Sequence, residues 1–109
     1  MSHPIRGLIY ALKSDSAFQI EIIGGAIALF ILHFAFGPFS AEGQLLLIFC
    51  WFLVMITELQ NSAVETALDQ IHPEHHEKIG RSKDLAAAAV IWAATFSLIS
   101  LIFVLSGKI

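Results

Sequence analysis

Long apolar runs separated by short polar segments dominate the chain, which is the pattern of a membrane protein. The clearest run, Leu85 to Leu105, has 21 residues and no charge. At about 1.5 Å per residue it would reach about 31 Å, close to the thickness of a bilayer's hydrocarbon core. A second run, Ile22 to Phe39, has 18 residues and contains the helix-stopping pair Gly37 and Pro38 near its end. Both runs are therefore predicted to span a membrane as helices.

The segment between these two runs changes character halfway along. Leu45 to Ile56 is wholly apolar but has only 12 residues, too few to cross a membrane. The helical pattern then continues to Ile71 with polar side chains. A helix of 27 residues over 45–71 would be about 40 Å long, so its last turns should project through the headgroups into water. Three spans over about 22–39, 45–71 and 85–105 are thus expected.

The amino-terminal segment has helical spacing but is too polar to cross. Pro4 to Ile20 mixes apolar side chains with Arg6, Lys13 and Asp15, and we expect it to lie on the membrane as an amphipathic surface helix. The predicted fold class is an all-α membrane protein with a single domain over residues 1–109. The opening seven residues lack an apolar core and a small-residue cleavage site, so no cleaved signal peptide is expected.

Composition supports this class and excludes others. The chain is 57 % apolar and 14 % charged, with a mean hydropathy of +0.78, whereas soluble domains are about 45–50 % apolar and about 25 % charged. A net charge of −3 with six basic residues rules out a basic nucleic-acid-binding module. The single cysteine, Cys50, excludes an internal disulfide and a multi-cysteine metal site.

The basic residues predict an orientation. Five of the six precede the first span or lie between the second and third: Arg6, Lys13, Lys78, Arg81 and Lys83. Because lysine and arginine accumulate on the cytoplasmic side, the amino terminus is expected inside and the carboxyl terminus outside, in a multi-pass protein of a bacterial inner membrane.

Polar residues on the middle helix form one face, here called the polar stripe: Glu58, Asn61, Glu65 and Asp69. Their spacings of 3, 4 and 4 place them within about 80° of one another around a helix. A carboxylate at membrane depth costs about 2.5–3.5 kcal/mol, so the stripe should line a protein interior or a wet cleft. For Asp69, it is equally reasonable that the side chain only solvates the end of the helix and lines no cleft. Asp15 and Glu21 are available as partner carboxylates, and Mg²⁺ prefers one or two carboxylates with phosphate oxygens.

The segment before the last span adds basic groups in the run Gly80-Arg81-Ser82-Lys83-Asp84. They could pair with anionic lipid headgroups or clamp a phosphate, although the sequence of a Walker loop is absent. Nearby, His72, His75, His76 and Glu77 could suggest a metal site. Adjacent histidines diverge on a helix, however, so a solvated or nucleotide-contacting loop is the favoured interpretation. Trp51 and Trp92 are expected to pack against protein or face lipid.

The run from Glu58 to Asp69 (ELQNSAVETALD), followed by Glu74-His75-His76, the segment 80–84 and an alanine-rich last span, resembles the prokaryotic diacylglycerol kinase family of small integral membrane lipid kinases. The resemblance extends from Gly7 to the last span. It implies a homotrimer of three-span protomers, each preceded by a surface helix. It also implies that ATP and Mg²⁺ phosphorylate a lipid hydroxyl at the cytoplasmic interface.

By this resemblance, Glu58 matches a general base with Asn61 beside it, and Glu65 matches a carboxylate that binds metal and nucleotide. The remaining expected nucleotide contacts are His76, Lys83 and Asp84, and the expected substrate contacts are Glu58, Ser62 and Asp69. Asp15 stands where the family commonly has glutamate as a second metal-binding carboxylate, with a side chain one methylene shorter. His75-His76 replaces the usual Tyr-His, and the amino-terminal basic residues of longer members are missing except for Arg6 and Lys13 as substitutes.

The resemblance makes diacylglycerol the expected acceptor, with phosphatidic acid as product. Undecaprenol, used by related members, is the alternative, since unspecific apolar residues would line either pocket. A non-enzymatic channel subunit is a competing class. A channel predicts polar residues across the whole membrane, and Leu45 to Ile56 contains none.

Overall fold

The computed structural model describes residues 3–71 and 77–109. These residues form four helices, α1 (His3–Ser14), α2 (Ser16–Phe36), α3 (Ala41–Ile71) and α4 (Glu77–Leu105), and the described ranges contain no strand. The predicted all-α class is confirmed. Three of the helices, α2, α3 and α4, are long and apolar enough to cross a membrane, as expected of a protein with three spans.

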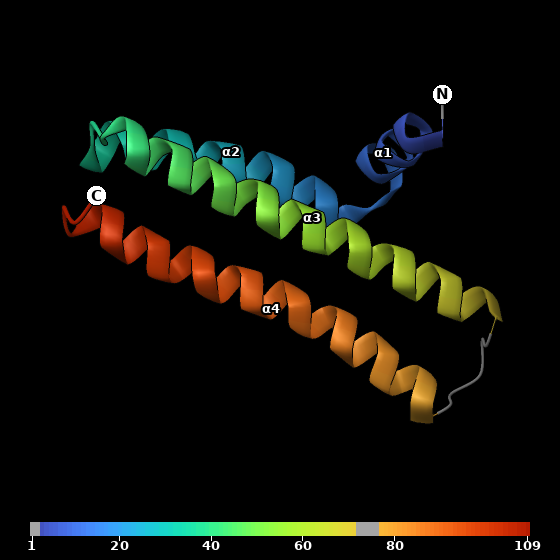
Figure 1. Cartoon of the computed structure of the whole chain (residues 1–109). Coiled ribbons are helices and arrows are strands. Elements are labelled where there is room, and N and C mark those ends of the chain that lie inside the picture. Colours follow the sequence, from blue (N-terminus) through green and yellow to red (C-terminus); the bar gives the residue numbers. More distant parts are fainter. Residues whose placement is uncertain (1–2, 72–76) are drawn as a thin grey trace.

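The three long helices run up and down beside one another, with α3 packed against both α2 and α4 (Figure 1). The short α1 leaves this layer at an angle. The amino terminus, the end of α3 and the start of α4 lie toward one end of the molecule, and the carboxyl terminus lies beside the α2–α3 connection at the other (Figure 1). The predicted polar segments therefore share one end.

The prediction of one surface helix over residues 4–20 is wrong in its extent. The backbone of Asp15 is extended (φ −96°, ψ 104°), and its side chain accepts a hydrogen bond of 3.1 Å from the Phe18 N–H as the N-cap of α2. Aspartate is a favoured N-cap because its carboxylate satisfies an otherwise unpaired amide at the helix start. The first long helix therefore begins at Ser16 and not at Ile22. That α1 lies on a membrane surface stays a prediction.

The other helix ends also differ from the apolar runs. α2 ends at Phe36 because Gly37 is extended and Pro38 has no amide hydrogen to continue the helix. α3 begins at Ala41, four residues earlier than predicted, since the Ser40 hydroxyl accepts the Gly43 N–H at 2.9 Å.

The greatest difference concerns α4, which begins at Glu77, eight residues before the apolar run. The segment 80–84 was predicted to lie before the last helix, as part of the polar loop over 72–84, and this is wrong: the segment forms turns of α4. Its charged side chains are consequently fixed to a helix that continues into the apolar region.

Two small clusters form the interior. One, between α3 and α4, is centred on buried residues of both helices: Leu47, Cys50, Ala93, Ser100 and Val104. The other joins α1, α2 and α3 through Ala11, Phe18 and Met55. Within α2, only 6 % of its apolar 18-residue stretch is buried inside the chain. A surface this apolar needs lipid or another protein against it.

Candidate functional site

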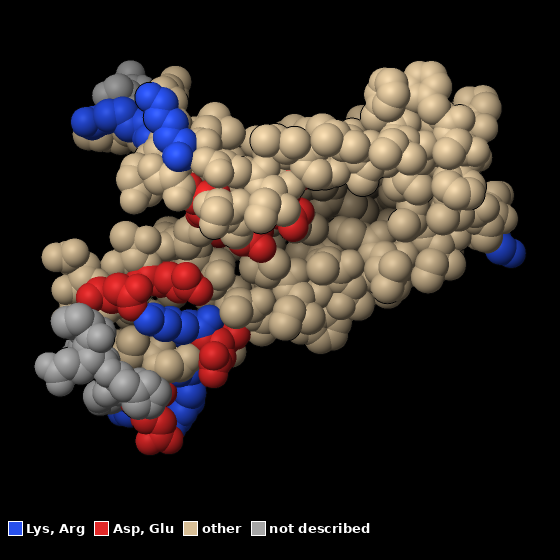
Figure 2. Space-filling model, turned by 180° about the vertical axis from the view of Figure 1, so that it is seen from behind, with Lys and Arg blue, Asp and Glu red and all other residues tan. Residues whose placement is uncertain are grey.

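The polar stripe lies on a continuous helix, because α3 extends without interruption to Ile71. Glu58 and Asn61 are half-buried, whereas Glu65 and Asp69 are exposed. The stripe thus passes from contact with protein to contact with solvent. Figure 2 shows the same change on one face of the molecule, where most charged side chains gather toward one end and a wide uncharged surface follows.

Glu58 is half-buried, and its carboxylate is subject to other negative charges. The charges of Glu21 and Asp15 from the α2 region, and of Glu65 on α3, all act on it. Like charges at short range repel, and a nearby cation relieves that repulsion. Glu21 was named from the sequence as an available partner but was not placed in the predicted site. Its position beside Glu58 depends on how α2 packs on α3.

Asp15 and Ser62 are brought into direct contact. The Ser62 hydroxyl donates to Oδ2 of Asp15, while Oδ1 accepts the Phe18 amide. A carboxylate oxygen has more than one acceptor position, so Asp15 keeps capacity for a further ligand. The contact places the predicted metal-binding aspartate against the α3 surface that carries the stripe.

Asn61 has an acceptor atom to spare. Its Nδ2 donates to Oε1 of Glu65 at 3.4 Å. Its Oδ1 is buried and has no hydrogen-bond partner among the described residues. Because buried polar atoms are nearly always paired, this oxygen is suited to a ligand that enters the site.

Lys83 reaches the stripe from α4. Its Nζ donates to Oδ1 of Asp69, which joins the two helices at the polar end. Asp84 is exposed on the same helix. Arg81 pairs with Glu77 at 2.8 Å along the α4 surface. His76, predicted to contact nucleotide, lies outside the described residues.

Within the described ranges, no three or more His, Cys, Asp or Glu side chains are placed to hold a metal ion together. A complete metal centre of protein ligands is thus not formed by this part of the chain. Glu65, Asn61 and Asp15 instead offer hard oxygen donors. They fit Mg²⁺ that receives its remaining ligands from phosphate oxygens.

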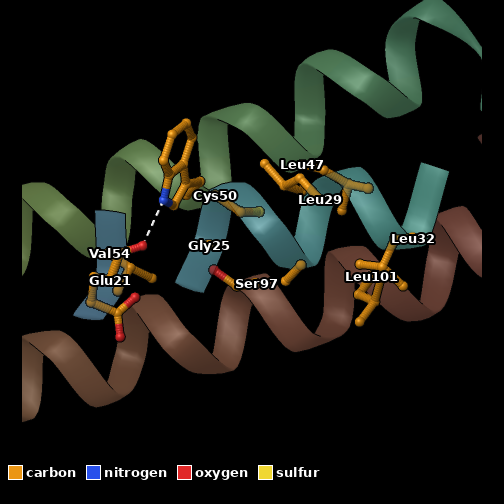
Figure 3. A pocket seen from close by; sticks show the side chains of 11 residues that line it. Glu21, Gly25, Leu29, Leu32, Leu47, Cys50, Val54, Ser97 and Leu101 are labelled. Carbon is orange, nitrogen blue, oxygen red and sulfur yellow. Dashed lines mark hydrogen bonds between the residues drawn. The ribbon is translucent and has the colours of Figure 1, made fainter. Parts of the chain in front are cut away.

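Two pockets adjoin these residues. The first, of about 520 Å³, lies between α1 and α3, and its lining includes Tyr10, Asp15 and Ser62. The second, of about 190 Å³, lies between α2, α3 and α4, and Glu21 is the charged residue in its otherwise largely apolar wall (Figure 3). No sequence signal pointed to Tyr10, because its place in the pocket wall depends on how α1 lies against α3.

Comparison with known proteins gives consistent matches. The family model described as prokaryotic diacylglycerol kinase matches residues 2–105. A protein of Escherichia coli named diacylglycerol kinase is 38 % identical over 95 residues, which are 87 % of this chain and 76 % of that protein. One of the same name from Haemophilus influenzae is 42 % identical over 91 residues, 84 % of this chain and 75 % of the relative. A third, from Pseudomonas aeruginosa, is 27 % identical over 105 residues, 96 % and 84 % of the two chains.

Proposed function

The chain belongs to the prokaryotic diacylglycerol kinase family and is a lipid kinase, and from this premise we propose that it transfers the γ-phosphate of ATP to the hydroxyl of diacylglycerol. The product is phosphatidic acid. The observation that supports this most directly is the half-buried carboxylate of Glu58 just after the apolar half of α3, where the negative charges of Glu21, Asp15 and Glu65 act on it. At that level an acceptor with acyl chains in the membrane would present its hydroxyl.

Glu58 acts as the general base. It accepts the proton of the lipid hydroxyl, whose oxygen forms a bond to the γ-phosphorus while the bond to the β-phosphate oxygen of ATP breaks and ADP leaves. Phosphoryl transfer depends on positioning and charge neutralisation more than on covalent chemistry. No serine or cysteine nucleophile is needed.

Glu65, with Asn61 beside it, and Asp15 would hold Mg²⁺ together with the nucleotide. When bound, the ion neutralises negative charge on the phosphates. Asn61 orients Glu65 through its amide hydrogen bond, and its unpaired Oδ1 remains available as an acceptor. Ser62 holds Asp15 in place.

Lys83 binds the phosphate chain, and Asp84 and His76 contact the nucleotide. Lys83 is available for this because exposed ion pairs are weak, about 0–1 kcal/mol, and its partner Asp69 is 61 % exposed. On ATP binding, the ammonium exchanges one carboxylate for a phosphate. Asp69 remains at the edge of the lipid headgroup site.

The active assembly is a homotrimer in the inner membrane with its amino terminus in the cytoplasm. The exposed apolar surface of α2 supports assembly in a membrane. The placement of Arg6, Lys13 and Lys83 toward the same end supports the orientation.

The test is phosphate transfer by the purified chain in lipid bilayers with radiolabelled ATP and Mg²⁺. Diacylglycerol and undecaprenol are supplied separately at equal mole fraction. We expect labelled phosphatidic acid as the main product. Preferred labelling of undecaprenol would overturn the assignment of diacylglycerol as the acceptor but would leave the kinase chemistry in place. Transfer to neither lipid would overturn the proposed function.

A further inference from the structure

A tryptophan on α3 is bonded to the backbone of α2. The indole Nε1 of Trp51 donates to the carbonyl oxygen of Glu21 at 2.9 Å (Figure 3, dashed line). In a regular helix this oxygen also accepts the amide of Gly25, four residues later. The indole therefore uses the second acceptor position of the carbonyl.

The contact depends on the absence of a side chain at position 25. A Cβ on Gly25 would lie 2.2 Å from Nε1 and 2.3 Å from Cδ1 of Trp51. Helical side chains tilt toward the amino terminus, so any side chain here would cover the carbonyl that Trp51 reaches. The adjacent Gly24 has nothing within 4 Å of its Cβ position. A side chain is therefore tolerated at position 24 but would collide with Trp51 at position 25.

Trp51 lies partway along the seam between α2 and α3, since Leu29 of α2 and Leu47 of α3 line a common pocket beyond it. Further along α3, Met55 and Leu59 continue the same face at intervals of four residues and pack with Phe18 and Ile22. These apolar contacts favour burial but are non-directional. The seam ends at the hydrogen bond between Ser62 and Asp15.

Glu58 lies between these two polar contacts along α3. The contact on one side involves Glu21, and the contact on the other involves Asp15. These are the two α2-region carboxylates whose charges act on Glu58. A slip of α2 by one residue would shift it about 1.5 Å and rotate its side chains by about 100°, which would move the Glu21 carboxylate away from this position.

We propose that Trp51 is a positioning residue: with Gly25 it sets the register of α2 on α3 and so holds the Glu21 carboxylate beside Glu58 in the phosphotransfer site. This inference rests on the proposed function. Trp51 itself contacts no reacting atom. Its effect reaches the reaction through α2.

The first test replaces Trp51 with phenylalanine, which keeps an aromatic ring and removes the N–H donor. In bilayers, Trp51→Phe should lower kcat about tenfold and leave KM for ATP and lipid within about twofold, because misplaced groups reduce the chemical step. Gly25→Ala should reproduce the loss. Gly24→Ala and Trp92→Phe are matched controls, since Gly24 has open space and Trp92 is 75 % exposed, and both should retain wild-type kcat.

A double-mutant cycle separates positioning from general stability. Glu21→Gln removes the charge but keeps the carbonyl that Trp51 binds. In the Glu21→Gln background, Trp51→Phe should lower the midpoint of thermal unfolding as before but cause no further fall in kcat. Unchanged kcat in Trp51→Phe, or equal fold losses of kcat in both backgrounds, would overturn the proposal.

A distance measurement tests the register of α2 on α3 without an assay of phosphate transfer. Spin labels at exposed Ile31 and Ile48, introduced as cysteines in a Cys50→Ala background, report the placement of α2 against α3. Gly25→Ala should shift or broaden the distance distribution, and Gly24→Ala should not. An unchanged distribution in Gly25→Ala would overturn the register claim, even if the wild-type protein transferred no phosphate and the proposed function failed.

Discussion

The hydroxyl of Ser62 donates to the carboxylate of Asp15, so a residue of the α3 interior surface is bonded to the residue at which α2 begins. The same carboxylate caps α2 through the Phe18 amide. Asp15 therefore has a structural task and a charge, and the two can be separated by substitution.

Asp15→Asn should keep the cap and lose the charge. Asparagine caps helices about as well as aspartate, so unfolding in detergent should change little, while phosphotransfer should fall and require more Mg²⁺. Asp15→Ala should lose phosphotransfer and also about 1 kcal/mol of stability. Thermal unfolding and initial rates measure the two effects. Full activity of Asp15→Asn would show that its charge has no part in the reaction.

Glu58→Gln should lower kcat by about 10²–10⁴-fold, the usual contribution of a general base. The Mg²⁺ concentration for half-maximal rate should remain as in the wild type. Circular dichroism and cross-linking check that the helices and the assembly persist. A rate near that of the wild type in this variant would remove Glu58 from the role of base.

Glu65→Gln should instead act through the metal. We expect loss of activity together with an increased Mg²⁺ requirement, because one of the oxygen donors loses its charge. A Mg²⁺ titration of the initial rate distinguishes this pattern from that of Glu58→Gln. If both variants responded alike to Mg²⁺, the assignment of separate roles would be wrong.

Lys83→Met should raise KM for ATP about tenfold or more, since it removes the cation proposed to bind the phosphates. Asp69→Asn should change stability by less than about 1 kcal/mol, as for an exposed pair. Arg81→Gln is the matched control, because Arg81 pairs with Glu77 on the surface of α4. Equal KM values in Lys83→Met and Arg81→Gln would contradict the phosphate role.

Topology can be tested on intact cells with a membrane-impermeant thiol reagent. In a Cys50→Ala background, Ser106→Cys should be labelled from outside, and Ser14→Cys should be labelled only after the cells are opened. Both serines are exposed. The reverse pattern would place the polar stripe outside the cell and away from ATP.

The sequence was sufficient for the helical class and for three spans, because long apolar runs have few alternative structures. It was insufficient for the helix ends. Asp15 and Ser40 cap helices through single hydrogen bonds, which leave no periodic signal. The start of α4 was missed because its first turns carry charged side chains. The prediction began the helix only where the uninterrupted apolar run begins, at Leu85.

The stripe on α3 could be predicted because its residues share one helix and its geometry follows from spacing alone. The roles of its residues stay predictions. The position of Glu21 beside Glu58 and the bond from Trp51 to Glu21 could not be predicted in this way, since both depend on the register between two helices. Apolar periodicity identifies the faces that meet, but it does not specify their relative translation.

The uninterrupted course of α4 has a consequence for how the enzyme senses its surroundings. Lys83 belongs to a rigid rod that continues through the hydrocarbon region. Spanning helices respond to bilayers of different thickness by tilting, so we expect a thinner or thicker membrane to displace the ammonium group relative to Asp69. If Lys83 binds the phosphates as proposed, turnover should vary with the acyl-chain length of the surrounding lipid, and initial rates in bilayers of defined chain length would measure this dependence.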